Sequence, residues 1–424
     1  MQRLVVLSAV LAFASIKTCD GTLAVESVQQ QLLRSVQSPE GSPIPNLYLA
    51  LRLSGDHSHA LETQYLRKIT TELHNDIQSS LSQGVPGAGL LSQYAMCVLA
   101  SCRSLHAVTF TVQDKTDTLI THLKRQMRQE KESIDHSQKP LSSYFTFSGG
   151  VLALCLAGVR VNVHHTAHLI TAVQHDKLAE AGTVGSVDTL SMAGMALSCE
   201  KKAGFYTHGE AALDAAIQKI KDQLEVTGED FSIGNKYSTP MAVMALVAMG
   251  SHKDLSSTML SLEADAQSGA YTNPMALSYV LMGLQRKSYL DLKHINCQNE
   301  QNNLVLEPEV EQDVLVEAVP VQKVMVVVEV VKSGGQIHLY TVHVPKGASL
   351  LTALKLIRDK NTGFTFEVEP SQWGPFLSNV NGEHARQSDR RAWNLLSDGA
   401  LLSQGINDFK IQGPQVFAIR NTAY

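Results

Sequence analysis

Hydrophobic positions recur every three or four residues from about residue 25 to residue 296, which is the spacing of one face of an α-helix. Within this region, segments rich in Ala, Gly, Met and Leu and almost free of charge alternate with amphipathic segments. A helix that is apolar all round has to be enclosed by other helices, whereas an amphipathic helix can face water. The uncharged segments, which return about every 35 to 55 residues, are LLSQYAMCVLASC, GGVLALCLAG, DTLSMAGMALSC, TPMAVMALVAMG and NPMALSYVLMG.

The alternation predicts an inner ring of buried helices within an outer ring of amphipathic ones, which is an α/α barrel; an irregular bundle or an open solenoid is the alternative. Asn273-Pro274 and Thr239-Pro240 are typical of an N-cap followed by the first helical residue, and Asp188 lies at the start of another uncharged helix. Inner helices of such a barrel run the same way, so their unpaired N–H groups gather at one rim. Helix capping alone is enough to explain each of these residues. Their clustering at one rim indicates a surface that can bind amide and phosphate oxygens.

The pattern changes after Cys297, where a polar and acidic stretch over 298–316 is predicted to be a linker. Beyond it, VMVVVEVV and QIHLYTVHV flank SGG as in a β-hairpin, ASLLTALKLIRDKN has helical spacing, and FTFEVEP and QVFAIRN have strand character. The sequence therefore predicts a mostly α chain, with a helical domain over 19–297 and a small β-rich α+β domain over 317–424.

The first 18 residues have the features of a secretory signal peptide. Arg3 precedes an apolar run from Leu4 to Ile16 that is too short to span a bilayer comfortably, and polar residues follow. A buried N-terminal helix is the alternative. No later stretch is long and apolar enough to cross a membrane, so we expect secretion without membrane insertion. Six cysteines in an oxidising compartment predict disulfides, whose pairing the spacing leaves open.

Charge and motifs argue against several classes of function. The net charge of −5 over 424 residues gives no basic footprint for nucleic acid. The sequence contains no G-x-S-x-G, P-loop, G-x-G-x-x-G after a strand, or H-E-x-x-H motif. His164, His165 and His168 form the densest histidine cluster, but without a convincing further ligand a solvated helix face is favoured over a metal site. We therefore expect a protein that is not an enzyme.

Several segments are specific enough to identify a family. The ordered set V-D-T..M-A-G, G-N-x-Y-S-T-P and L-x-Q-G-I-x-D resembles the transcobalamin, intrinsic factor and haptocorrin family of cobalamin (vitamin B12) carriers, over essentially the whole chain. The matching stretches are YLALRLSG (48–55), VLALCLAGVRV (151–161), SVDTLSMAGMALSC (186–199), GNKYSTPMAV (234–243), KSYLDL (287–292), GPFLSNV (374–380), RRAWNLLSD (390–398) and LLSQGINDF (401–409).

The resemblance implies an α6/α6 barrel followed by a small β-rich domain, with the corrinoid sandwiched between the two. It implies a secreted protein that binds and transports cobalamin and delivers it to a cell-surface uptake receptor, without a catalytic cofactor; we expect a monomer. The alternatives are a broad-specificity corrinoid binder, similar to haptocorrin, and an α/α-barrel enzyme. The resemblance also pairs Cys102 with Cys297 and Cys155 with Cys199, and it leaves Cys19 and Cys97 either free or paired with each other.

The family's ligand contacts fall on residues near the predicted helix starts and in the small domain. Val184 stands where transcobalamin presents a histidine that can ligate cobalt, so no metal ligand from the protein is expected. Leu90 and Tyr279 stand where glutamine contacts are expected, which removes two hydrogen bonds. The contacts that the resemblance implies are Ser142, Ser143, Tyr144, Phe145, Thr146, Asp188, Asn235, Ser238, Gly374, Pro375, Trp393, Asn394 and Leu395.

Overall fold

The chain folds into two compact units, Met1–Glu307 and Pro308–Tyr424. We consider each unit by itself. The signal peptide predicted over 1–18, Cys19 and Val184 lie outside the described residues. The computed structural model describes residues 23–38, 43–84, 87–160, 162–178, 186–207, 209–227, 230–308, 323–360, 363–371, 374–385, 391–402, 405–407 and 409–423.

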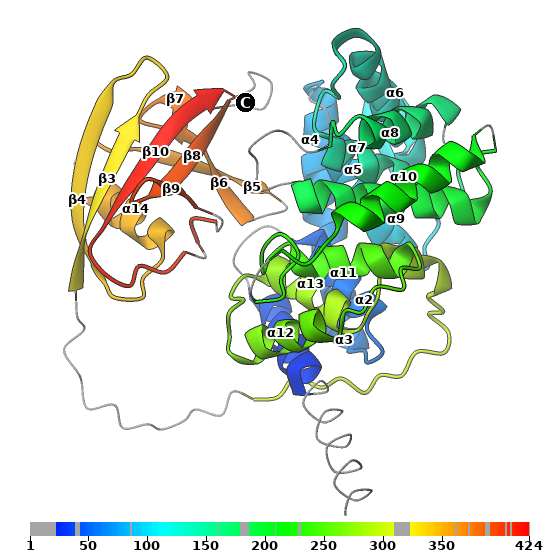
Figure 1. The fold of residues 1–424 in the computed structure, drawn as a ribbon, viewed down its shortest axis with the longest axis horizontal. Helices are drawn as coiled ribbons and strands as arrows, with labels where there is room; N and C mark the ends of the chain where they lie inside the picture. Colours follow the sequence, from blue (N-terminus) through cyan, green and yellow to red (C-terminus); the bar gives the residue numbers. More distant parts are fainter. Residues whose placement is uncertain are drawn as a thin grey trace, which may run out of the picture. The chain divides into compact units, whose positions relative to one another are not determined.

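Six helices of the first unit form a closed inner ring (Figure 1). Each packs against the next one in chain order, and the last packs against the first. Their side chains are almost entirely buried, which is possible because these segments carry almost no charge. The ring confirms the predicted barrel over an irregular bundle or an open solenoid. Its members are α2 (Pro45–Leu53), α5 (Ala88–Ala100), α7 (Tyr144–Leu156), α9 (Ser186–Ala203), α11 (Thr239–Ala248) and α13 (Pro274–Leu284).

The outer layer consists of amphipathic helices that each bury one stripe against the ring. In the outer helix α6 (Leu119–Ser137), for example, Leu119, Leu123 and Met127 repeat every four residues and are fully buried, whereas Lys124 and Arg128 are exposed. The remaining outer elements are a helix over 23–37, α3 (His59–Lys68), η1 (Ile69–Leu73), α4 (His74–Ser82), α8 (Val163–Gln174), α10 (Glu210–Gln223) and α12 (Ser256–Gln267).

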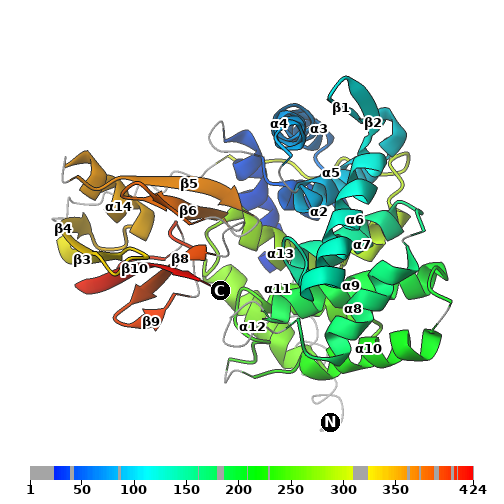
Figure 2. The same ribbon diagram turned by 90° about the horizontal axis from the view of Figure 1, so that it is seen from above.

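A β-hairpin interrupts the helical unit, although hairpin signals in this region are scarce. Strands β1 (Thr109–Val112) and β2 (Lys115–Thr118) pair antiparallel beside α4 and α6 (Figure 2). Gln113 and Asp114 form the turn with φ of 51° and 61°. Such two-residue turns usually contain Asn-Gly or Asp-Gly because both residues need positive φ. The hairpin could not be recognised from the sequence because neither turn residue is glycine or asparagine.

Residues 298–307, which were predicted to begin the linker, are hydrogen-bonded to the helical unit. The backbone N–H of Leu304 donates to the carbonyl oxygen of His57 at 2.9 Å. The Gln30 side chain donates to the carbonyl oxygen of Val305 at 2.8 Å and accepts from the N–H of Glu307 at 2.9 Å. The first compact unit therefore extends beyond Cys297 to Glu307, because paired backbone groups hold this polar segment in place.

Two disulfides cross-link the helical unit. Cys102 pairs with Cys297 across 195 residues, and Cys155 pairs with Cys199 across 44 residues. These are the two pairs that the resemblance implies. Cys97 is a free thiol, fully buried in α5.

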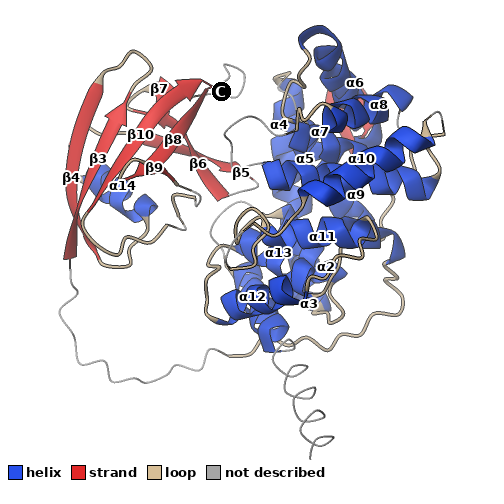
Figure 3. Ribbon diagram, viewed as in Figure 1, coloured by secondary structure: helices blue, strands red, loops and turns tan. Residues whose placement is uncertain are grey.

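The second unit is a small α+β domain in which strands and one helix pack together (Figure 3). The predicted hairpin forms from β3 (Lys323–Val331) and β4 (Ile337–Pro345), and the predicted helix is α14 (Leu350–Asp359). The main sheet has the order β4-β3-β10-β8-β9, with β10 parallel to β3. The other strands are β5 (Phe366–Ser371), β6 (Gly374–Val380), β7 (Glu383–His384), β8 (Arg391–Ser397), β9 (Ala400–Leu401) and β10 (Gln415–Ala423).

The predicted fold class, a mostly α barrel followed by a small β-rich domain, is confirmed. Leu350, Ala353, Leu354 and Ile357 of α14 are fully buried and give the second unit a hydrophobic core of its own. No helix in the described parts of either unit has both the length and the apolar character that a membrane span requires.

Candidate ligand-binding rim

The starts of the inner helices meet at one end of the barrel. Asn46, at the start of α2, lies beside Met275, at the start of α13, with 3.1 Å between Nδ2 and the sulfur. A Cβ atom added at Gly89, at the start of α5, would lie 3.4 Å from the Thr146 methyl group in the first turn of α7. Because the N-terminal ends of helices carry free N–H groups and partial positive charge, this rim suits amide and phosphate oxygens. We call these six helix starts the rim.

The α7 segment of the rim contains five of the residues that the resemblance implies. Ser143 is the N-cap, and its hydroxyl oxygen accepts a hydrogen bond from the N–H of Thr146 at 3.1 Å. Tyr144 and Phe145 are buried, whereas Ser142 and Thr146 are partly exposed. Local capping therefore accounts for the Ser143 hydroxyl, which also donates to the Thr146 hydroxyl at 3.2 Å. The Ser142 hydroxyl is buried and has no partner among the described residues.

Asp188 stands in the first turn of α9, where the helix dipole favours a negative charge. Burial nevertheless raises the pKa of its carboxyl group to about 7, despite the lowering effect of a hydrogen bond from the Ser238 side chain. Its Oδ1 atom is buried without a hydrogen-bond partner among the described residues. A buried acceptor with no partner is costly, so this atom is a ready site for a ligand N–H group.

The loop before α11 places Ser238 beside Asp188, and Asn235 lies three residues earlier in this loop. The Asn235 side-chain oxygen accepts hydrogen bonds from the N–H groups of Tyr237 at 2.8 Å and Ser238 at 3.0 Å. The amide nitrogen of Asn235 is the part of the side chain that these bonds leave unused. The helix itself begins at Thr239, so Ser238 is the N-cap rather than Thr239 as predicted. The difference is one residue, because the backbone of Ser238 already has helical dihedral angles.

Asn273 is the N-cap of α13 as predicted, and its side chain accepts from the N–H groups of Met275 and Ala276. Sequence reasoning missed Asn46 and Tyr289, and it did not find their contacts with Tyr279. Asn46 donates to the Tyr279 hydroxyl at 2.6 Å and accepts from the Tyr289 hydroxyl at 3.0 Å, and all three are buried. No sequence signal distinguishes these residues from their apolar neighbours, because the three meet only when the ring closes.

This network includes Tyr279, which stands where the resemblance places a glutamine contact. The tyrosine hydroxyl accepts a hydrogen bond from Asn46 inside the barrel. Leu90, the other residue of this kind, lies on α5 with 39% of its surface exposed. It contributes an apolar surface near the rim instead of an amide.

The second unit contains the remaining residues that the resemblance implies. Trp393 and Asn394 are neighbours on β8, so their side chains point to opposite faces of the sheet. Trp393 is buried, and its Nε1 atom has no partner in the described structure. Asn394 is exposed and donates to the Thr422 hydroxyl at 2.6 Å, whereas Leu395 is half-buried. Gly374 and Pro375 begin β6, and their side-chain surroundings lie outside the described part of the chain.

The histidine cluster at the start of α8 does not converge on one point. His165 is buried and lies 2.9 Å from the carbonyl oxygen of Met127, His168 faces Asp135 at 2.8 Å, and His164 is exposed. Among the described residues, no group of three or more His, Cys, Asp or Glu side chains could hold a metal ion.

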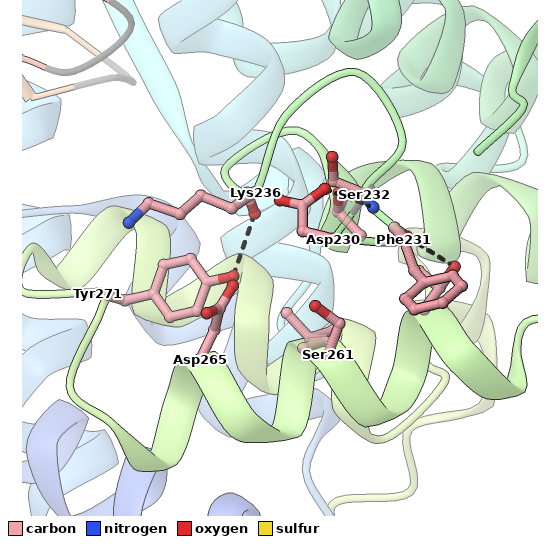
Figure 4. Close-up of a pocket in the computed structure, with 10 residues that line it drawn as sticks. Asp230, Phe231, Ser232, Lys236, Ser261, Asp265 and Tyr271 are labelled. Carbon is pink, nitrogen blue, oxygen red and sulfur yellow. Dashed lines mark hydrogen bonds between the residues drawn. The ribbon is translucent and has the colours of Figure 1, made fainter. Parts of the chain in front are cut away.

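A small pocket lies between α12 and the loop that leads into α11 (Figure 4). The Tyr271 hydroxyl donates to the carbonyl oxygen of Lys236 at 3.1 Å in its wall. The pocket holds about 190 Å³ of empty space, open solvent included, which is below the range of ordinary small-molecule sites. It is therefore too small for a macrocycle. Its lining residues are Asp230, Phe231, Ser232, Lys236, Thr239, Thr258, Ser261, Leu262, Asp265 and Tyr271.

Comparisons with known proteins agree with the residue pattern. The family model described as "Eukaryotic cobalamin-binding protein" matches residues 1–316, and a domain of unknown function (DUF4430) matches residues 347–419. Transcobalamin-2 of Mus musculus is 31% identical over 98% of this chain and 96% of its own length. Cobalamin binding intrinsic factor of Homo sapiens is 24% identical over 91% and 90%.

A solved structure of haptocorrin in complex with Cbi shares the fold. Its TM-score is 0.71 at 22% identity, and the match covers 95% of this chain and 97% of haptocorrin. The family model spans the whole barrel, including the helix starts described above. The chain therefore belongs to the family of eukaryotic cobalamin-binding proteins.

Proposed function

We propose that this protein is a secreted, non-catalytic carrier that binds one cobalamin and delivers it for receptor-mediated uptake. Membership of the family, over residues 1–316, supports the choice of ligand. The observation that supports the place of binding is the unpartnered Oδ1 of Asp188, in the rim of helix starts. Family relatives named for transcobalamin and intrinsic factor support the transport role.

The chemistry of the ligand matches the groups of the rim. Cobalamin has a broad apolar macrocycle fringed with amide side chains, and a nucleotide loop with a phosphate. Asp188 would accept a hydrogen bond from an amide N–H, and Ser142, Thr146 and Asn235 offer hydroxyl and amide groups for the others. Trp393 has a buried N–H that a ligand oxygen would satisfy. The proposed contacts are those given above for the resemblance, and they contain no catalytic cluster.

A binding experiment tests the proposal. The mature chain is incubated with cyanocobalamin, passed over a gel-filtration column and examined by visible spectroscopy. We expect about one corrinoid to co-elute with each protein molecule, at the volume of a monomer. The variant Asp188→Ala should lose the corrinoid about tenfold faster, the factor that corresponds to one hydrogen bond. Asp222→Ala, an exposed aspartate of α10, is the matched control. A wild-type protein without co-eluting corrinoid would show the proposal to be wrong.

Broad corrinoid specificity is the second candidate, and Tyr279 and Leu90 favour it. These two residues supply no amide to the ligand, so fewer hydrogen bonds discriminate between analogues. Competition between cyanocobalamin and cobinamide, which lacks the nucleotide, separates the two candidates. A broad binder should have dissociation constants for the two corrinoids that lie within about tenfold of each other. A selective carrier should bind cyanocobalamin more than about tenfold more tightly than cobinamide.

Secretion and delivery need tests of their own. Expression in animal cells should yield the protein in the medium, with an N-terminus near Cys19. Cells of the same organism should take up radiolabelled cobalamin bound to the protein, and excess unlabelled complex should block this uptake. Retention inside the expressing cell would contradict secretion, and uptake that excess complex does not reduce would contradict a receptor.

A further inference from the structure

Helix α6 belongs to the outer layer, yet it bonds to two segments of the rim. Glu130 is fully buried, and its Oε2 atom accepts a hydrogen bond from the N–H of Ser142 at 3.1 Å. Ser142 directly precedes Ser143, the N-cap of α7. The side chain of an outer helix thus holds the segment that leads into an inner one.

A second residue of α6 does the same for the neighbouring inner helix. The side-chain oxygen of Gln126 accepts from the N–H of Gly87 at 3.4 Å, and Gly87 is the N-cap of α5. Gln126 and Glu130 are four residues apart, so they project from the same face of α6. Two acceptors on one helix therefore contact the N-terminal segments of two adjacent inner helices.

Helices α6 and α7 pack so closely that a shift of one helix would move the other. Met127, between the two acceptors, lies directly over Gly150 of α7, where a Cβ atom would collide with its sulfur. The starts of α5 and α7 also touch, because Gly89 lies against Thr146. A shift of α6 would therefore displace both segments together, since closely packed interiors deform little.

The carboxyl group of Glu130 is in an unusual environment for a structural residue. Burial raises its pKa, and hydrogen bonds from Ser142 and from the backbone of Leu141 oppose that effect. An apolar residue at this position would fill the interior at lower cost. Glu130 instead places a buried carboxyl group here, and this group accepts a hydrogen bond from the backbone N–H of Ser142.

We propose that Glu130 and Gln126 are positioning residues for corrinoid binding, which set the spacing between the starts of α5 and α7. The inference rests on the proposed function. Neither side chain touches the ligand, because both point from α6 onto loop backbone. Their effect reaches the ligand through Ser142 and Thr146, which flank the N-cap of α7.

The test compares release of cyanocobalamin with thermal unfolding. Dissociation is followed in a chase with excess aquocobalamin, for Glu130→Ala, Glu130→Gln and Gln126→Ala. We expect Glu130→Ala to release the corrinoid about tenfold faster, and Glu130→Gln, which keeps an acceptor oxygen, to lie within about threefold of wild type. Glu132→Ala, an exposed glutamate on the same helix, should be unchanged.

A destabilised control separates positioning from general stability. Leu213→Ala removes a buried side chain of α10, away from both loops, and should lower the unfolding temperature without accelerating release. The inference is wrong if Glu130→Ala releases cobalamin at the wild-type rate, or if Leu213→Ala accelerates release equally. If Glu130→Ala does not fold, Gln126→Ala, which should also release the corrinoid faster than wild type, decides by the same criterion. Failure of wild type to bind would instead contradict the proposed function.

Discussion

The carboxyl group of Asp188 accepts a hydrogen bond from the side chain of Ser238, which joins the start of α9 to the N-cap of α11. This contact links two inner helices at the rim, and it leaves Oδ1 of Asp188 buried without a partner in the described structure. The aspartate is therefore only partly satisfied in the free protein. We therefore expect the protonation of the Asp188 carboxyl group to be coupled to the binding of the ligand.

We predict that cobalamin binding releases a proton between about pH 5 and 7. Burial raises the pKa of Asp188 to about 7 in the free protein, so the group is mostly protonated at pH 6. An amide N–H from the ligand favours the carboxylate and lowers that pKa. Calorimetry at pH 6 in two buffers with different heats of ionisation measures the release. Asp188→Asn should abolish it, and equal release from the variant would contradict the assignment.

The same group makes the stability of the free protein depend on pH. A carboxyl group whose pKa rises on folding stabilises the folded state while it is protonated. For Asp188 this contribution is complete below its ordinary pKa of 3.8 and is lost as the pH rises through about 7. Asp188→Asn should therefore raise the unfolding temperature relative to wild type at pH 8 but not at pH 4. A difference that is constant across this range would argue against the raised pKa.

Arg52 should be one of the most sensitive positions for stability. Its guanidinium group is buried, with Nη1 2.8 Å from Glu62, Nη2 bonded to Glu300, and Nε donating to the carbonyl oxygen of Ala100 at 2.9 Å. Arg52→Ala would leave the two glutamates without their cation, which costs about 3 to 5 kcal/mol. Urea denaturation measures the loss. Arg67→Ala, an exposed arginine of α3, should change stability little, and equal effects of the two variants would refute the prediction.

The two disulfides should differ in their contribution to stability. In the chain-entropy model the bridge across 195 residues contributes about 5 kcal/mol and the bridge across 44 residues about 4 kcal/mol. Replacing Cys102 and Cys297 by alanine should therefore destabilise more than replacing Cys155 and Cys199. The Nη2 atom of Arg52 lies 3.2 Å from the sulfur of Cys297, so loss of this bridge would also remove a contact of the buried arginine. This second effect increases the expected difference in stability. Denaturant unfolding gives the order, and the reverse order would contradict it.

We expect bound aquocobalamin to keep the spectrum of its water-ligated form. By the resemblance, Val184 stands where transcobalamin is expected to present a cobalt-ligating histidine, and valine has no donor atom. Visible spectra before and after binding provide the measurement, and Val184→His is the positive control. A spectral shift of the wild-type protein to the histidine-ligated form would show that another histidine reaches the cobalt.

Much of the fold follows from local sequence. The uncharged helical segments predict their own burial, and the turn SGG predicts the β3–β4 hairpin. The hairpin β1–β2 was missed because Gln113 and Asp114 adopt positive φ in a turn that contains neither glycine nor asparagine. The N-cap Asn273 was predicted, since capping depends on neighbouring residues alone. The pairing of the cysteines followed from the resemblance, because spacing by itself allows several combinations.

The sequence by itself determined an inner and an outer class of helices, a β-rich second unit and the residue types of the helix starts. Only the tertiary structure decided which of these starts touch one another. The contacts of Asp188 with Ser238, of Asn46 with Tyr279, and of Glu130 with Ser142 join elements far apart in the chain. Periodicity reports which face of a helix is buried, but not which neighbour covers it. Ring closure settles that choice, because it brings six separate N-terminal ends to one rim.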